Sequence, residues 1–201
     1  VATGDELPEQ WSVNSRKIDF YDIKGEVEKL FSMKGNISGL SFEAGQLPWM
    51  HPGASAIIYL DGKHVGWCGA VHPNVLKALE IKNTVFAFEI DLDALLSRDI
   101  PFAKEISRFP SVRRDIAVML PIDVTYRKVE ECIKEAAGPY LESVNVFDVY
   151  QGSNLKDGYK SLAIGLIFNN VSSTLRDEDV DPAIKGVVDR LELRLGAQLR
   201  G

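Results

Sequence analysis

Three side chains in the second half of the sequence have the types and spacing needed to bind a planar ligand. Asp148 and Tyr150 are two residues apart in one predicted strand, and Ser161 lies in the predicted strand that follows. Because alternate side chains of a strand point to the same face, the carboxylate and the ring should lie side by side. A carboxylate accepts hydrogen bonds from paired N–H donors, a hydroxyl donates or accepts, and an aromatic ring stacks on a flat ring system. These residues predict a recognition site for a planar, hydrogen-bonding group, and we assign no catalytic residue.

The elements that must position these residues follow from the hydrophobic periodicity of residues 107–201. Apolar residues alternate with period two in the predicted strands and recur at helical spacing in the predicted helices. In chain order these elements are a strand at 115–120, a helix at 126–137, strands at 141–150 and 159–169, a helix that begins near Asp181-Pro182 after a turn at 177–180, and an edge strand at 197–200. This βαββαβ order predicts a ferredoxin-like domain, with two helices on one face of an antiparallel sheet.

Strand periodicity also predicts which residues lie on the sheet face away from the helices. Small residues on this open face would let a planar group approach the sheet, as in sheet platforms that bind single-stranded RNA bases. An ordinary solvated face of the same fold fits the pattern as well, because ferredoxin-like domains have many functions. The residues predicted on the open face include Ala117, Val146, Asp148, Tyr150, Ser161, Ala163 and Gly165, whereas Phe147 and Val149 are predicted to face the helices.

The first half of the chain predicts a separate antiparallel α/β unit. Its clearest feature is a hairpin, because apolar strands on either side flank the turn pair Asp61-Gly62. A helix is predicted after Asp22, whose side chain can cap it. The three histidines lack the short fixed spacing of a metal site, and no glycine-rich loop opens a helix. A proline-containing segment at 99–108 without periodicity separates the halves, so we expect one domain at 1–103 and another at 107–201.

Composition limits the classes of function. The 201 residues carry a net charge of −6, which argues against broad, nonspecific nucleic-acid binding but is compatible with a local, specific contact. No apolar run is long enough to cross a membrane, and no signal-peptide pattern opens the sequence. The two cysteines lie in different halves outside any CxxC pair, as expected for reduced thiols in a cytoplasmic protein.

Seven short segments resemble segments of one known family, and those in the second half come in the family's order and spacing. Four lie in the second half, at 109–118 (FPSVRRDIAV), 147–152 (FDVYQG), 160–163 (KSLA) and 174–178 (TLRDE). Three lie in the first half, at 19–25 (DFYDIKG), 51–53 (HPG) and 66–73 (GWCGAVHP). The second half resembles the ferredoxin-fold anticodon-binding domain that closes the beta subunit of bacterial phenylalanyl-tRNA synthetases. The first half resembles the non-catalytic, class II synthetase-like module of the same subunit.

This resemblance implies that the chain is a C-terminal part of such a subunit. The family's enzymes attach phenylalanine to its tRNA as cytoplasmic α2β2 heterotetramers, with ATP and magnesium. The implied partners are therefore phenylalanine tRNA and the alpha subunit, with no membrane and no DNA. We find neither of the arginine-bearing class II catalytic motifs in residues 1–103. We therefore expect this module to be a truncated, non-catalytic one that holds no cofactor itself and packs its apolar surface on another part of the enzyme.

The resemblance also suggests a ligand for the predicted open face. An anticodon for phenylalanine begins with guanine, whose Watson–Crick edge presents adjacent N1–H and N2–H donors. We expect Asp148 to accept both hydrogen bonds and Tyr150 to stack on the base. Ser161 is expected to hydrogen-bond the base, and Ala117 to leave room for it.

Two other functions fit the predicted fold. One is a small-molecule-binding regulatory domain of ferredoxin-like fold, which needs no RNA contact. The other is an acylphosphatase-like enzyme, which uses an arginine in a phosphate-binding loop after the first strand. Arg113 and Arg114 precede that strand, so the sequence disfavours the enzyme.

Overall fold

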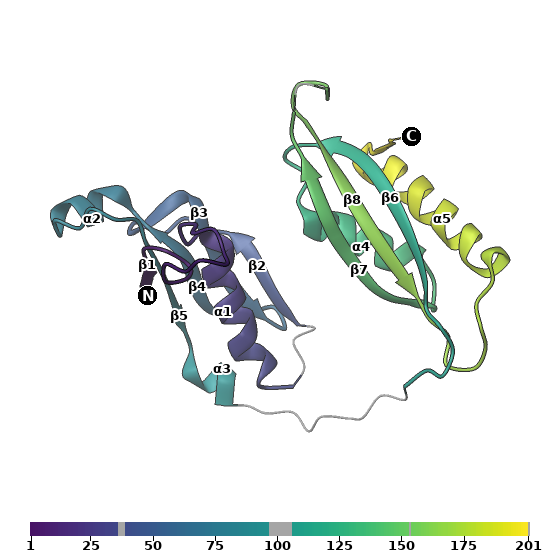
Figure 1. Ribbon diagram of the computed structural model, residues 1–201, viewed down its shortest axis with the longest axis horizontal. Helices are drawn as coiled ribbons and strands as arrows, with labels where there is room; N and C mark the ends of the chain where they lie inside the picture. Colours follow the sequence, from purple (N-terminus) through teal and green to yellow (C-terminus); the bar gives the residue numbers. More distant parts are fainter. Residues whose placement is uncertain (36–38, 97–105, 153, 201) are drawn as a thin grey trace. The chain divides into compact units, whose positions relative to one another are not determined.

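The computed structural model describes residues 1–35, 39–96, 106–152 and 154–200 of an α+β chain. The chain divides into two compact units, Val1–Ala103 and Lys104–Gly201, and each unit has its own antiparallel sheet (Figure 1). The segment predicted to join the halves, 99–108, lies mostly outside the described residues. Within the described ranges, no helix is both long enough and apolar enough to cross a membrane.

The first unit is a five-stranded sheet with one long helix on one face. Its strands lie in the order β1-β5-β4-β3-β2. Apolar residues recur on one side of helix α1, where Val27 and Phe31 are fully buried and pack in one cluster with Ile58 and Cys68 of the sheet. The elements are β1 (Ala2–Thr3), α1 (Phe20–Ser32), β2 (Leu40–Ala44), β3 (Met50–Leu60), β4 (Lys63–Val71), α2 (Pro73–Ala78), β5 (Val85–Ile90) and α3 (Leu92–Leu96).

The hairpin predicted from the Asp61-Gly62 pair is confirmed as β3 and β4. Asp61 has φ 50° and Gly62 has φ 77°, so both turn residues adopt the left-handed conformation. This is the turn type whose twist matches the two strands, and aspartate followed by glycine is one of the pairs that favour it.

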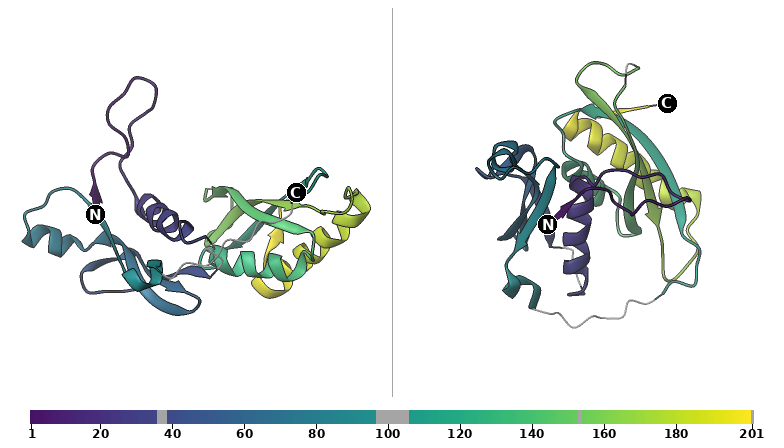
Figure 2. Two further views of the ribbon diagram at one scale, coloured as in Figure 1. Left: turned by 90° about the horizontal axis from the view of Figure 1, so that it is seen from below. Right: turned by 60° about the vertical axis from the view of Figure 1, so that its left-hand side comes forward.

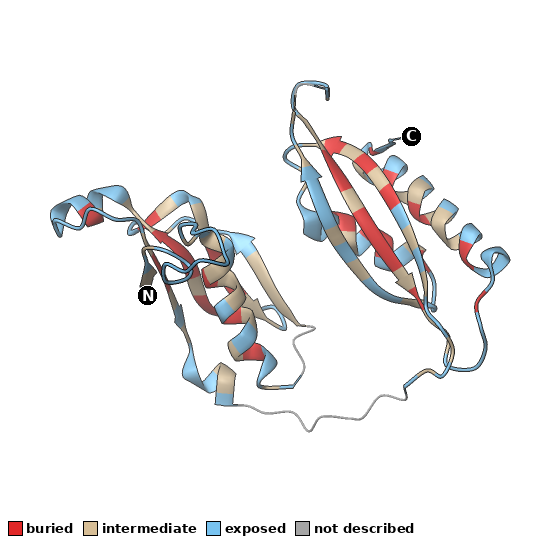
Figure 3. Ribbon diagram, viewed as in Figure 1, coloured by how far each residue is buried: buried red, intermediate tan, exposed pale blue. Residues whose placement is uncertain are grey.

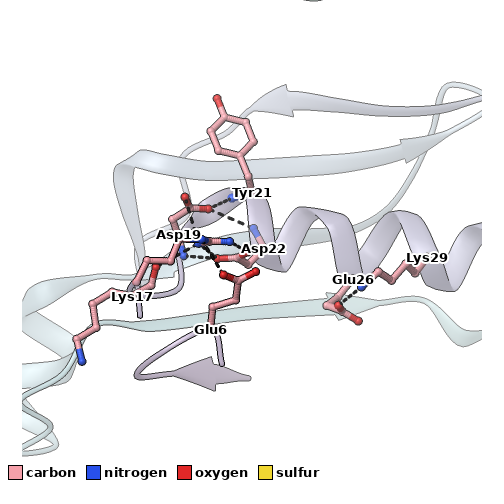
Figure 4. Close-up of polar contacts among 8 residues, drawn as sticks. Glu6, Lys17, Asp19, Tyr21, Asp22, Glu26 and Lys29 are labelled. Atoms are coloured by element: carbon pink, nitrogen blue, oxygen red, sulfur yellow. Dashed lines mark hydrogen bonds and ion pairs between the residues drawn. The ribbon is translucent and has the colours of Figure 1, made fainter. Parts of the chain in front are cut away.

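Helix α1 begins earlier than predicted, and Asp19 rather than Asp22 caps it. The Asp19 carboxylate accepts hydrogen bonds from the N–H groups of Tyr21 (2.7 Å) and Asp22 (3.2 Å), while Asp22 accepts from the Asp19 N–H (2.7 Å). Figure 4 shows this reciprocal capping box at the start of the helix. Arg16 donates to Asp22 at 2.6 Å, and this contact lowers the pKa of the Asp22 carboxyl to about 2. Asp22 therefore supports the cap from the first turn.

The two cysteines are reduced and buried, one in each unit. Burial raises the pKa of the Cys68 thiol from 9.0 to about 11, so the folded chain holds this proton more tightly than the unfolded chain does. The resulting stabilisation is complete below pH 9 and is lost as the pH rises toward 11.

We predict that both cysteines of the folded chain resist iodoacetamide at pH 8, because the reactive thiolate needs access to the reagent. Mass spectrometry should find no labelled Cys68 or Cys132 in the native chain and two labels per chain in guanidinium chloride. Rapid labelling of either thiol in the native chain would show that its burial is transient.

The second unit has the predicted βαββαβ order. Its sheet order is β7-β8-β6-β9, and both long helices lie on one face of it (Figure 2). Glu135 of one helix pairs with Arg190 (2.6 Å) and Arg194 (2.9 Å) of the other, and these contacts, the Arg190 hydrogen bond foremost, lower its pKa. The elements are β6 (Val112–Pro121), α4 (Tyr126–Ala136), β7 (Leu141–Tyr150), β8 (Tyr159–Phe168), α5 (Asp177–Leu195) and β9 (Gln198–Leu199).

The start of α5 corrects a prediction. The sequence predicted a turn at 177–180 and a helix from Asp181-Pro182, but α5 begins at Asp177 and contains Pro182 in its second turn. The proline removes the hydrogen bond to the Glu178 carbonyl. Glu178 and Pro182 are both exposed, so water can replace this bond. Three acidic residues in the first turn also favour an early start, because they interact with the positive end of the helix dipole.

Candidate functional site

The four residues predicted to bind a ligand lie in two neighbouring rows across the second sheet. Asp148 pairs with Ala163, which pairs with Ala117 on the far side. Tyr150 pairs with Ser161, two residues away along β8. Paired residues in an antiparallel sheet point to the same face with their Cβ atoms about 5 Å apart. The strand register thus brings the four residues together on one surface.

This surface is the open face, opposite the helices. The residues that alternate with the site residues along β6 and β8 point to the other side of the sheet and are buried in the core there. They are Val118, Leu162 and Ile164. In Figure 3 the middle strand β8 is largely buried, whereas the edge strand β7 is largely exposed. A ligand can therefore approach the site from the β7 side of the open face.

The four residues differ in how accessible they are. Asp148 is exposed, and Tyr150 and Ala117 are half-buried. Ser161 lies on the predicted face but keeps only 4% of its surface exposed. A bound base would meet Asp148 and Tyr150 first, and Ser161 as part of the floor between them.

A β-bulge in β7 overturns the predicted orientation of Phe147 and Val146. The pairing shifts between Val146 and Asp148, so Phe147 is an extra residue in the strand. Phe147 is 50% exposed, and the Arg113 guanidinium carbon lies 5.2 Å from the centroid of its ring. Arg113 is four residues from Ala117 in the regular strand β6, so both side chains point to the open face, and the Phe147 ring beside Arg113 lies on this face too. Val146 pairs with buried Ile164 and packs against the core.

Val149 has the predicted side but not the predicted burial. It pairs with buried Leu162, which faces the helices, yet it remains 54% exposed. Its strand is at the edge of the sheet, and the helices do not cover this end.

The ring of Tyr150 is held in place by two features that the sequence analysis missed. A Cβ atom on Gly152 would lie 2.2 Å from the Tyr150 hydroxyl oxygen, so the ring occupies space that only glycine leaves free. The guanidinium carbon of Arg200 lies 5.6 Å from the ring centroid, and the backbone N–H of Arg200 donates to the carbonyl of Ala117 at 2.8 Å. Arg200 is far from β7 in the sequence and reaches it only through the pairing of β9 with β6.

A second arginine crosses the open face at the other end of the site. Arg113 Nε donates to Asp115 Oδ1 at 2.8 Å, and both side chains are about half exposed. The pair lies over Gly165, where an added Cβ would come within 3.2 Å of each partner. Two arginines and two aspartates therefore line the small-residue floor, and this surface can offer both cations for phosphates and a carboxylate for N–H donors.

Comparisons with known proteins give matches to both units. Residues 1–92 match the family model for the phenylalanyl tRNA synthetase beta chain CLM domain, and residues 107–200 match the ferredoxin-fold anticodon binding domain. The chain is 44% identical over 197 residues to a phenylalanine–tRNA ligase beta subunit from Xanthomonas oryzae pv. oryzae. It is 41% identical over 200 residues to that of Pseudomonas putida and 40% identical over 200 residues to that of Pasteurella multocida. The chain belongs to the phenylalanyl-tRNA synthetase beta chain family.

These matches cover 98% to 100% of the chain but only 25% of each relative. The chain thus spans about a quarter of the length of the beta subunits that it matches. The open-face residues Asp148, Tyr150 and Phe147 all lie inside the part that matches the anticodon-binding family. Of the two family descriptions, the one that matches the second unit says what the domain binds, an anticodon.

Proposed function

We propose that this chain is the C-terminal part of a phenylalanine–tRNA ligase beta subunit, and that the open face of its second unit binds the anticodon of phenylalanine tRNA. The observation that supports this most directly is the row geometry, in which the Asp148 carboxylate and the Tyr150 ring share one exposed surface above small residues. Asp148 reads the first anticodon base, Tyr150 stacks on it, and Ala117 and Ser161 complete the floor of the pocket.

The proposed role of the first unit is that of a non-catalytic, class II synthetase-like module. Its antiparallel sheet with α1 on one face supports this role, as does the match to the beta chain family. In this proposal the module scaffolds the assembly with the alpha subunit in an α2β2 enzyme of the cytoplasm. ATP and magnesium serve the aminoacylation reaction of the whole enzyme, and we assign neither to a residue of this chain.

The alternative function, a small-molecule-binding regulatory domain, gains no support from the site. The open face is a broad surface with exposed Asp148 and Phe147 at its edge strand. Small-molecule sites are usually concave and cover most of their ligand. A planar base that enters from solvent and stacks on one ring fits this surface better.

The test of the proposed function is the affinity of the full chain for the anticodon stem-loop of phenylalanine tRNA. Tyr150→Ala should weaken binding about 5- to 150-fold, since stacking on an aromatic side chain contributes about 1–3 kcal/mol per base. Fluorescence anisotropy at one fixed salt concentration measures it, because phosphate contacts vary with salt.

Tyr150→Phe is the matched control, because it keeps the ring and removes only the hydroxyl. This variant should bind nearly as well as the unchanged chain. Equal affinity of Tyr150→Ala and the unchanged chain would count against the proposed site. Equal binding of a stem-loop with an unrelated anticodon would count against specific recognition.

A further inference from the structure

We propose that Phe147 and Arg113 form a second nucleotide subsite on the open face, which binds the nucleotide next to the base held by Asp148 and Tyr150. The subsite rests on the proposed anticodon-binding function and extends it to a neighbouring base. Three observations support it: the exposure of the Phe147 ring, the position of Arg113 on that ring, and the spacing of the two aromatic residues.

Phe147 is exposed because the bulge in β7 turns it onto the open face. Half of its surface is exposed, whereas Phe31 and Phe168 are almost completely buried in the cores of the two units. Bulges commonly re-aim a side chain near a functional site. An exposed phenylalanine ring on a sheet with a floor of small residues offers a flat, apolar surface on which a base can stack.

Arg113 lies where a base or its phosphate would meet this ring. Its guanidinium carbon is 5.2 Å from the Phe147 ring centroid, and its only other charged contact in the described chain is the ion pair with Asp115. An exposed ion pair and an exposed contact between a cation and an aromatic ring each contribute little to the stability of the fold. A base can therefore displace Arg113 from the ring at small cost, and the guanidinium remains close enough to bind the phosphate with two parallel hydrogen bonds.

The sheet beneath Arg113 leaves space for its side chain because a glycine lies there. Its guanidinium passes over Gly165, and a Cβ there would approach the Nη2 atom to 3.2 Å. A larger residue would lift the arginine away from the sheet. Glycine at this position keeps Arg113 near Phe147 and leaves the Asp115 carboxylate beside it.

The spacing of the two rings fits adjacent nucleotides whose bases are splayed apart. Asp148 and Tyr150 are two regular strand residues apart, about 7 Å at about 3.3 Å per residue, and Phe147 lies beyond Asp148 in the bulge, so Phe147 and Tyr150 are more than about 7 Å apart along β7. This exceeds the separation of about 3.4 Å between stacked bases, so each base would stack on its own ring. The two ends of the site are also built alike, because Arg200 lies over Tyr150 as Arg113 lies over Phe147.

Phe147→Ala in the full chain tests the subsite against the anticodon stem-loop of phenylalanine tRNA and against stem-loops that each lack one loop base. The variant should bind the intact stem-loop about 5- to 150-fold more weakly. This loss should disappear with the stem-loop that lacks a base adjacent to the first anticodon position. The loss caused by Tyr150→Ala should disappear with a different RNA, the one that lacks the first anticodon base. Phe147→Tyr keeps the ring and should retain the affinity.

The outcomes separate this subsite from the proposed function. If Tyr150→Ala weakens binding and Phe147→Ala does not, the anticodon site stands and the second subsite is wrong. If no stem-loop binds the chain, both proposals are wrong. A Phe147→Ala loss that is the same for every stem-loop would also overturn the subsite, because no base would account for it.

Arg113→Gln tests the phosphate contact. The slope of log affinity against log salt concentration should fall by about one, because one phosphate contact is removed. An unchanged slope would show that Arg113 binds no phosphate.

Discussion

Asp148→Asn should remove most of the preference for guanine over adenine that we propose for this chain at the first anticodon position. The Asp148 carboxylate can accept hydrogen bonds only, which suits the two adjacent N–H donors of guanine. The amide of asparagine presents one acceptor and one donor, so one guanine donor would face another donor. The same amide can pair with the donor and acceptor of adenine. Discrimination should therefore fall about 5- to 150-fold, by analogy with paired base-edge contacts worth about 1–3 kcal/mol.

The measurement compares the affinities of two stem-loops that differ only in the first anticodon base. Asp115→Asn is the matched control, because Asp115 lies on the same face and forms an ion pair with Arg113. Its loss of one negative charge should strengthen the binding of both RNAs alike and leave their ratio unchanged. If Asp148→Asn keeps the guanine preference of the unchanged chain, Asp148 does not read this base.

The parts of the fold that follow from local chemistry could be predicted from the sequence. Aspartate and glycine in succession favour one turn type, so the prediction of the β3–β4 hairpin and of its turn was correct. In β6 and β8 the alternation of apolar residues runs without a bulge, so the predicted faces agree with the structure there. The same alternation placed Asp148 and Tyr150 on one face, since both lie after the bulge in β7.

The errors come from interactions that alternation cannot represent. One extra residue in β7 reversed the orientation of Val146 and Phe147, and nothing in the sequence of that strand marks the bulge. The position of Arg200 depends on the pairing of β9 with β6, which joins distant parts of the chain. Pro182 predicted a late helix start, although an exposed proline near the helix N-terminus can be tolerated. The missed residues at the site, Phe147, Arg113 and Arg200, are those whose positions depend on tertiary structure.

Gly69 in β4 combines a left-handed φ with two close backbone neighbours. Its φ is +146°, and an added Cβ would lie 2.3 Å from the carbonyl oxygen of Ala54 and 2.6 Å from the Cα of Ser55. Both neighbours belong to the backbone of β3, so no side-chain rotation can relieve the overlap. Residues beside Gly69 in β4 pair with β3 on one side and β5 on the other, and the sheet therefore cannot open there without loss of pairing.

Gly69→Ala should therefore lower the free energy of unfolding of the first unit by about 2–6 kcal/mol. Backbone strain accounts for about 1–3 kcal/mol of this, and overpacking against β3 accounts for a similar amount. Gly25→Ala is the matched control, since Gly25 lies inside α1 with no atom within 4 Å of an added Cβ. That variant should raise the free energy of unfolding by about 1 kcal/mol, because alanine is the better helix former.

Tryptophan fluorescence during denaturant unfolding measures both effects on the first unit alone, because all three tryptophans lie in residues 1–103. Trp67 is two residues from Gly69 in β4, and its ring lies 6.4 Å from that of Trp49, so this signal reports on the affected strands. The anticodon stem-loop should bind both variants as it binds the unchanged chain, since the open face belongs to the other compact unit. A Gly69→Ala chain as stable as the Gly25→Ala chain would show that β3 can move away from β4 at little cost. The close approach of the two backbones would then not be what requires glycine at this position.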